Sequence, residues 1–285
     1  MRRTRWNTSR PPSAPRARRL PQWPRVTIEP ASLVAHRGYA ARYPENTRES
    51  LAAAVCAGAR FLEFDVQLSA DGVPVLLHDD TLDRTAGQPG SVFELNAAQL
   101  SGIEVNDTAR LGPAFSGVRI PLLRDVAADL TAWPGVTAFV ELKPESLVHF
   151  GIGYMLDRVL EALAPVLDAC VVISFSAQAV AEARRRSACE IGWAIEHWSE
   201  ESCETATALA PGYLFCNYRK FPLPPAPLWP GPWRWVAYEV TGLELANALV
   251  GRGVDLVETM AIAELSAAAR AISPGTNPSS AAGRA

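Results

Sequence analysis

The sequence has no run of 18 apolar residues, no Cys-x-x-Cys pair, and no apolar segment in its arginine- and proline-rich start. Because a helix needs about 20 mostly apolar residues to cross a bilayer, no membrane-spanning helix is expected. The start of the chain also differs from a secretory signal. The five cysteines are odd in number and irregularly spaced, which indicates reduced thiols and a cytoplasmic protein rather than a disulfide framework.

Acidic residues are scarce at the beginning of the chain. Residues 1–30 carry eight arginines and a single acid, Glu29, whereas the remainder holds 19 basic and 29 acidic residues. This acidic remainder argues against nucleic-acid binding by the folded part. We expect residues 1–30 to be a disordered basic leader, and residues 266–285 to contain the end of a helix and a disordered tail.

The length of 285 residues and the apolar fraction of 48% suit one large domain. Short apolar segments predict eight strands, at Leu33–Ala35, Phe61–Val66, Thr137–Leu142, Cys170–Ser174, Glu190–Ile195, Tyr213–Cys216, Trp235–Val240 and Val254–Glu258. Helical patterns lie between most of them, at Glu49–Ala57, Tyr154–Leu163, Ala177–Arg186, Ser202–Ala210 and Leu243–Val250. These repeats predict an α/β fold, a (β/α)8 TIM-type barrel over residues 31–265.

Two stretches depart from the simple repeat. Residues 79–120, between the second and third strands, are too long for one crossover and form a small insertion with a short helix near Asn96–Leu100. After the sixth strand, six prolines in residues 221–235 exclude a regular helix. Trp229 and Trp233 in this loop either line the active-site mouth and stack on a quaternary ammonium group, or cover the side of the barrel with apolar area.

The densest polar motif runs from His36 to His78. It begins where a short apolar strand ends, with an arginine and a glycine directly after the first histidine. In the next strand, Glu63 and Asp65 share one face because side chains alternate, and an Asp-Gly turn at residues 71–72 leads a return strand back to His78. Two carboxylates side by side in a packed interior need a positive partner, which a hard divalent cation supplies.

A later strand adds Glu141 and Lys143 on one shared face. The assembled groups suit metal-assisted attack on a phosphate ester, in which the cation polarises the phosphoryl oxygens. Arg37 and Lys143 would bind the phosphate charge. The imidazoles of His36 and His78 would serve as base and acid.

In this order and spacing, the motifs resemble those of the glycerophosphodiester phosphodiesterases. The matching segments are His36-Arg37-Gly38, Glu45-Asn46-Thr47, Glu63-x-Asp65, the Asp-Gly turn before His78-Asp79, Leu82-Asp83-Arg84-Thr85 and Glu141-Leu142-Lys143. The resemblance covers residues 32–262. It implies a TIM-type barrel whose insertion caps the active-site side, and hydrolysis of a glycerophosphodiester, such as glycerophosphocholine or glycerophosphoethanolamine, to glycerol 3-phosphate and an alcohol.

The same resemblance implies roles for individual residues. These are the metal ligands Glu63, Asp65 and Glu141, the acid–base pair His36 and His78, and the phosphate-binding residues Arg37 and Lys143. All-oxygen ligation favours one Mg²⁺ or Ca²⁺ ion over zinc without choosing between the two. Phe175 is a further pocket candidate, and Asn46 either touches the metal or substrate or caps the following helix.

Some features leave alternatives open. Thr259 is followed by Met260 where the family often has an aspartate, and Glu239 and Glu258 are acids that would bind a substrate hydroxyl or amine. A lysophospholipase D activity on lysolipids is the nearest alternative, and a non-catalytic phosphodiester-binding barrel is another. We expect a small-molecule substrate, no nucleic acid and no stable membrane insertion; the oligomeric state and the identity of the acid histidine stay open.

Overall fold

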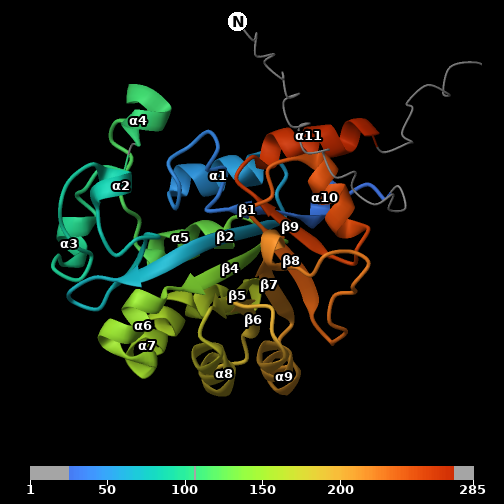
Figure 1. Cartoon of the computed structure of the whole chain (residues 1–285). Helices are drawn as coiled ribbons and strands as arrows, with labels where there is room; N and C mark the ends of the chain where they lie inside the picture. The colour runs from blue at the N-terminus through green and yellow to red at the C-terminus, as the bar shows by residue number, and fades with distance from the viewer. Residues whose placement is uncertain (1–25, 106, 273–285) are drawn as a thin grey trace, which may run out of the picture.

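Eight parallel strands close into a barrel, as predicted (Figure 1). The structure is a computed structural model that describes residues 26–105 and 107–272. The barrel strands are β1 (Leu33–His36), β2 (Phe61–Leu68), β4 (Thr137–Leu142), β5 (Cys170–Ser174), β6 (Glu190–Ile195), β7 (Tyr213–Asn217), β8 (Arg234–Tyr238) and β9 (Leu256–Thr259). β1 pairs with both β2 and β9, which closes the barrel, and β3 (Pro74–Leu76) pairs antiparallel with β2 outside it.

Helices surround the barrel (Figure 1). They are α1 (Arg48–Cys56), α5 (Leu123–Thr131), α6 (Pro144–Phe150), α7 (Ile152–Leu163), α8 (Ala177–Arg186), α9 (Glu200–Leu209), α10 (Leu243–Val250) and α11 (Ile262–Ile272). All five helical patterns read from the sequence are confirmed. The sequence reading missed α5, because no side chain caps its N-terminus to mark a start, although its apolar residues recur at helical spacing.

A cluster of tryptophans stands where the sixth helix would be. Between β7 and β8, the described residues 218–233 contain only one short 3-10 turn, which confirms the prediction made from the prolines. The ring centroids of Trp198 and Trp229 lie 3.9 Å apart, and those of Trp198 and Trp235 lie 5.5 Å apart. Trp233 meets Trp235 edge-on. These rings join the apolar core outside the strands, so they cover the barrel wall in place of a helix.

A small apolar layer fills the inside of the barrel. Its buried members are Val34, Phe139, Val171, Ile173, Ala194, Phe215, Val236 and Leu256. The ring of Phe139 stacks on Phe61 and meets Tyr213 and Phe215 edge-on. Because side chains alternate along β4, Phe139 and Glu141 face the same way, and the apolar layer forms the floor beneath the polar side chains.

The insertion has an apolar cluster of its own, beside the C-terminal end of β2 (Figure 1). Its helices are α2 (Asp83–Ala86), α3 (Ala97–Leu100) and α4 (Thr108–Leu111), of which α3 confirms the predicted short helix. The Arg110 guanidinium donates hydrogen bonds to the carbonyls of Ala40 at 2.6 Å and Tyr43 at 3.3 Å. The insertion therefore braces the loop that follows β1.

The two ends of the chain fall largely outside the described residues. Residues 1–25 of the expected basic leader and residues 273–285 of the expected tail belong to that part. The last helix, α11, runs from Ile262 to Ile272, so its end lies within residues 266–285, where the sequence predicts the end of a helix. Over the described residues, no helix combines the length and apolarity needed to span a bilayer.

Replacing Phe139 by alanine should lower the free energy of unfolding by about 3–5 kcal/mol, because the cavity left in a closed barrel interior cannot collapse. Leu223→Ala is the matched control, since that side chain is 75% exposed, and it should change the free energy by less than about 0.5 kcal/mol. Urea denaturation followed by circular dichroism measures both. Equal losses in the two variants would contradict a packed barrel interior.

Candidate active site

A cavity of about 210 Å³ lies at the C-terminal ends of the barrel strands, where barrel enzymes carry their catalytic residues. It is lined by His36, Arg37, Glu63, His78, Glu141, Lys143, Ile173, Phe175, Ala194, Phe215, Tyr238, Glu239 and Glu258. The structure thus brings together the two predicted histidines, both predicted phosphate-binding residues and two of the three predicted metal ligands. The third ligand, Asp65, lies directly behind the cavity wall, 3.1 Å from Arg37 and 3.3 Å from Lys143.

Strand register explains why the carboxylates meet. His36 pairs with Glu63 across β1 and β2, and Asp65 pairs with Glu141 across β2 and β4. Because Glu63 and Asp65 are two residues apart in β2, they face the same side. One oxygen atom from each of Glu63, Asp65 and Glu141 consequently lies within 4.8 Å of the others.

Asp65 is the carboxylate with the most positive charge around it. Arg37 Nε lies 3.1 Å from its Oδ2, and Lys143 Nζ lies 3.3 Å from its Oδ1. Burial would raise the pKa of Asp65, but Arg37 and Lys143 outweigh burial and hold the pKa well below its usual value. Lys143 also donates to Glu141 at 3.0 Å. This ion-pair network keeps the side chains of Arg37 and Lys143 fixed at the cavity wall.

Glu63 and Glu141 have less positive charge around them. Burial and the neighbouring carboxylates raise the pKa of Glu63 well above its usual value, and they raise the pKa of Glu141 to about 7. Glu63 Oε1 is buried without a hydrogen-bond partner, whereas Asp65 Oδ1 lies 3.3 Å from Lys143 Nζ. Converging carboxylate oxygens are the ligands that a hard divalent cation takes, and the buried Glu63 Oε1 lacks any other partner, so these three side chains fit the predicted metal.

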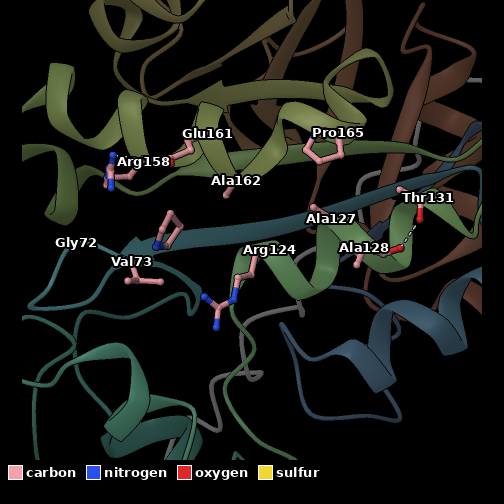
Figure 2. Close-up of a pocket in the computed structure, with 11 residues that line it drawn as sticks. Gly72, Val73, Arg124, Ala127, Ala128, Thr131, Arg158, Glu161, Ala162 and Pro165 are labelled. Atoms are coloured by element: carbon pink, nitrogen blue, oxygen red, sulfur yellow. Dashed lines mark hydrogen bonds and ion pairs between the residues drawn. The ribbon is translucent and has the colours of Figure 1, made fainter.

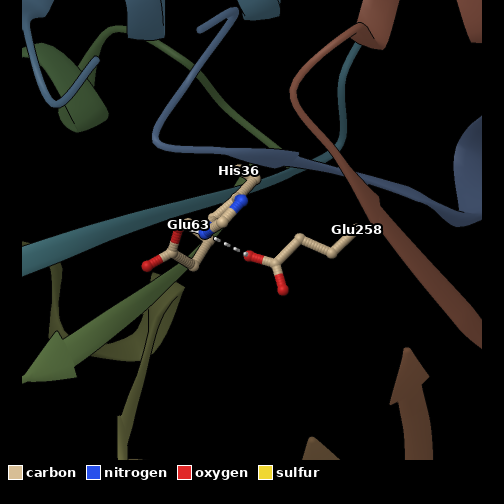
Figure 3. A group of neighbouring side chains, drawn as sticks. All are labelled: His36, Glu63 and Glu258. Atoms are coloured by element: carbon tan, nitrogen blue, oxygen red, sulfur yellow. Dashed lines mark ion pairs between the residues drawn. The ribbon is translucent and has the colours of Figure 1, made fainter. Parts of the chain in front are cut away.

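The first histidine lies at the end of β1. Burial lowers the pKa of His36 to about 3, and the neighbouring Arg37 adds to this effect. The imidazole is therefore neutral at pH 7. Its Nε2 lies 3.8 Å from Glu63 Oε2 and 3.8 Å from Glu258 Oε1 (Figure 3).

A chain of polar contacts holds the second histidine. His78 Nδ1 lies 2.5 Å from Asp79 Oδ1, and Arg84 Nε donates to the other oxygen of Asp79 at 2.6 Å. Arg84 also donates two hydrogen bonds to Glu45, which accepts a further one from Arg37. Glu45 thus ties the loop after β1 to the insertion. Because the contact uses Nδ1, His78 keeps Nε2 for the cavity that it lines.

The four predicted pocket residues lie in different places in the structure. Phe175 lines the cavity. Asn46 lies behind the cavity, where it donates to Asp65 Oδ2 at 2.8 Å and accepts the Asp65 N–H at 3.1 Å, whereas Thr47 caps α1. Of the two alternatives for Trp229 and Trp233, the structure bears out the second, in which they cover the side of the barrel. Both pack on the outside of the barrel, because no sixth helix covers that wall.

Sequence reasoning gave Asp79, Arg84 and Tyr238 no role, and it gave Glu258 only a possible contact with substrate. The structure places Glu258 inside the barrel, 3% exposed. A signal for this was present: Glu258 lies two residues after Leu256, which faces the barrel interior, so strand alternation turns the acid inward as well.

A second hollow lies on the outside of the barrel, between α5 and α7 (Figure 2). It has a volume of about 570 Å³ and carries Arg124 and Arg158 on opposite sides. Arg158 pairs with Glu161 at 2.8 Å, and Arg124 lies 3.8 Å from Asp125. None of the predicted site residues lines this hollow, so the cavity inside the barrel is the candidate active site.

Gly38→Ala should destabilise the protein strongly. Gly38 has a φ of +78°, and an added Cβ would lie 2.5 Å from Ser50 Oγ and 2.6 Å from the Ser50 carbonyl carbon. The cost should therefore exceed the roughly 1–2 kcal/mol of the left-handed conformation alone. Gly87→Ala isolates that smaller cost, since Gly87 has a φ of +65° and open space around it. Urea denaturation compares the variants, and equal costs would argue against close packing of the turn on α1.

The ion pairs of Glu45 should stabilise the protein at neutral pH, and this contribution should be lost in acid. Burial would raise its pKa, but Arg84 and Arg37 outweigh burial and lower it. A carboxyl group whose pKa falls on folding stabilises the protein above its unfolded pKa, and this contribution is lost as the pH drops through the folded pKa. Glu45→Gln should therefore reduce the free energy of unfolding at pH 7 and have less effect at about pH 3. Denaturation at both pH values tests this, with the exposed Glu244→Gln as control; an equal cost of Glu45→Gln at both would contradict it.

Comparisons with known proteins point to one family. Residues 36–190 match the model of the glycerophosphoryl diester phosphodiesterase family. Glycerophosphodiester phosphodiesterase 1 of Rattus norvegicus is 36% identical over 112 residues, which are 39% of this chain and 34% of that protein. A glycerophosphodiester phosphodiesterase of Caldanaerobacter subterraneus is 32% identical over 129 residues, which are 45% of this chain and 52% of that protein. The matched segments thus span about a third to a half of these relatives.

Two solved structures share the fold. A putative glycerophosphoryl diester phosphodiesterase from Silicibacter pomeroyi superposes with a TM-score of 0.73 at 20% identity, over 85% of this chain and 94% of that one. An Oleispira antarctica phosphodiesterase, in complex with the product sn-glycerol-3-phosphate, superposes with a TM-score of 0.72 at 24% identity, over 85% of this chain and 96% of that one. At this level of identity the likeness supports the barrel fold.

Proposed function

Because the chain belongs to the glycerophosphoryl diester phosphodiesterase family, we propose that it hydrolyses a glycerophosphodiester to glycerol 3-phosphate and an alcohol, with glycerophosphocholine and glycerophosphoethanolamine as candidate substrates. The observation that carries this proposal is the convergence of two imidazoles, three carboxylates and two cationic side chains on one small cavity. The activity for which the relatives are named, and the product held by the Oleispira structure, support it.

The charged side chains of the cavity wall bind the phosphodiester. Glu63, Asp65 and Glu141 would hold one divalent cation, Mg²⁺ or Ca²⁺, and when bound this ion supplies Lewis-acid polarisation of the phosphoryl oxygens. Arg37 and Lys143 bind the negative charge of the diester. Their contacts with Asp65 orient both side chains before the substrate arrives.

The two histidines move the protons. The neutral imidazole of His36 accepts a proton from the nucleophile, which is either water or the glycerol hydroxyl beside the ester, the latter giving a cyclic phosphate. His78 donates a proton to the leaving alcohol, because Asp79 holds its ring through Nδ1 and leaves Nε2 for the cavity. The structure thereby favours one of the two assignments that the sequence leaves open.

The alternatives receive less support. A lysophospholipase D would need an apolar groove at the cavity mouth, and the tryptophans that could have formed it lie on the outside of the barrel. A purely binding barrel has no use for two imidazoles placed as acid and base. A cytoplasmic location stays part of the proposal, favoured by the five free cysteines.

With Mg²⁺ or Ca²⁺, the protein should release glycerol 3-phosphate from glycerophosphocholine or glycerophosphoethanolamine, and EDTA should abolish the release. His36→Ala and His78→Ala should each lower kcat by about 10²–10⁴-fold, the usual contribution of general acid–base catalysis. His197→Ala is the matched control, because its imidazole is 78% exposed and lies outside the cavity. A coupled glycerol 3-phosphate assay measures all four proteins.

Each other outcome has a defined meaning. Turnover that survives EDTA, or that survives both active-site substitutions, would contradict the mechanism. Calorimetric binding of the diesters without turnover would favour the binding barrel. Release of an alcohol from lysolipids, with no turnover of the small diesters, would favour the lysophospholipase D reading.

A further inference from the structure

The carboxylate of Glu258 has no role in the reaction described above, although it lies inside the same cavity. It is 3% exposed and projects from β9 toward His36 and Glu63 (Figure 3). We propose that His36, Glu63 and Glu258 form a second cation site, for a transition-metal ion such as Zn²⁺. The site rests on the proposed function only through Glu63, which it shares with the three-carboxylate site.

The spacing of the three side chains fits a cation. His36 Nε2 lies 3.8 Å from Glu63 Oε2 and 3.8 Å from Glu258 Oε1, and one ligand atom from each residue lies within 4.8 Å of the others. A point equidistant from atoms spaced in this way is about 2.1–2.5 Å from each, close to the roughly 2.0–2.2 Å at which zinc binds nitrogen and carboxylate oxygen. Only small side-chain rotations would be needed to bring the three ligand atoms to zinc-binding distance.

Charge balance also calls for a cation here. In the part of the chain that the structure describes, no lysine or arginine side chain forms an ion pair with Glu63 or Glu258, since the side chains of Arg37 and Lys143 contact other carboxylates. The one contact from Arg37 is its backbone N–H, which donates to Glu63 Oε2 at 3.0 Å. Glu63 is 2% exposed, and its Oε1 is buried without a hydrogen-bond partner. Buried carboxylates without compensating charge are costly, and an ion between them removes that cost.

The donor set selects the kind of ion. One imidazole nitrogen with two carboxylate oxygens is a ligand set that zinc takes in proteins, whereas Mg²⁺ and Ca²⁺ prefer oxygen alone. The three ligands come from adjacent strands, because β1 lies between β2 and β9. They are therefore held on a rigid part of the fold.

Occupation of this site would inhibit the enzyme. The ion would engage the lone pair on His36 Nε2, and that nitrogen could then no longer accept a proton from the nucleophile. Zinc is thus expected to oppose the activity that Mg²⁺ or Ca²⁺ supports. It would do so through His36, the proposed base, which lies beside the shared ligand Glu63.

The direct test counts zinc atoms bound per full-length chain, by equilibrium dialysis and elemental analysis. Glu258→Gln, which keeps the shape of the side chain and removes its charge, should bind one zinc fewer than the wild type. Glu239→Gln is the matched control, because Glu239 lines the same cavity but already pairs with Arg219, and it should bind as many as the wild type. Zinc on cysteine thiols is common to all three proteins and does not affect the difference.

Two further measurements do not depend on counting. With Mg²⁺ saturating, and with each rate taken relative to the zinc-free rate of the same variant, Glu258→Gln should need at least tenfold more zinc for half-inhibition than the wild type or Glu239→Gln. X-ray absorption of zinc-loaded wild type, compared with His36→Ala, should show one additional imidazole nitrogen. The absorption measurement requires no substitution at Glu258.

The outcomes separate the two proposals. Equal zinc counts and equal inhibition in the wild type and Glu258→Gln would overturn the second site and leave the proposed function standing. Loss of one zinc in Glu258→Gln, in a protein that turns over no glycerophosphodiester, would support the second site and count against the proposed function. Absorption spectra that do not change on His36→Ala would overturn the second site by themselves.

Discussion

The site depends on an imbalance of charge. Among the residues that the structure describes, the barrel holds four carboxylates around one small cavity besides the exposed Glu239, those of Glu63, Asp65, Glu141 and Glu258, and two permanently cationic side chains contact this group, those of Arg37 and Lys143. Both cations are drawn toward a single carboxylate, Asp65. An anionic phosphodiester would be repelled by ionised carboxylates that have no such partner, so the proposed cation would assist substrate entry as well as the chemistry.

The closed barrel holds these carboxylates close together. Parallel register places inward-facing residues of adjacent strands at the same height, which sets His36 beside Glu63 and Asp65 beside Glu141. Below them, the apolar layer around Phe139 excludes water and prevents the carboxylates from relaxing apart. The same rigidity that assembles the proposed catalytic groups also brings Glu258 to His36, so the second cation site follows from the geometry of the first.

The sequence was sufficient for the parts of this protein that follow from local pattern. Strand periodicity located all eight barrel strands, and the alternation in Phe61–Val66 identified Glu63 and Asp65 as partners. It was not sufficient where the outcome depends on distant packing, and there it left two alternatives open. Trp229 and Trp233 are in a loop that begins at the active-site end, and only the absence of a covering helix sends them to the outer wall. The polar chain from His78 to Glu45 joins segments that have no periodic signal.

The insertion at residues 79–120 packs in an apolar cluster separate from the barrel's. It contacts the rest of the chain through arginines, through hydrogen bonds to residues 70 and 71, and through stacking of Phe93 on His149. A segment attached in this way can gain or lose residues over evolution without shifting any strand of the barrel. Descendants of this chain could therefore exchange the whole segment, and with it the surroundings of His78, while the carboxylates keep their places. Diversification within the family can thus proceed by replacing a module rather than by rebuilding a site.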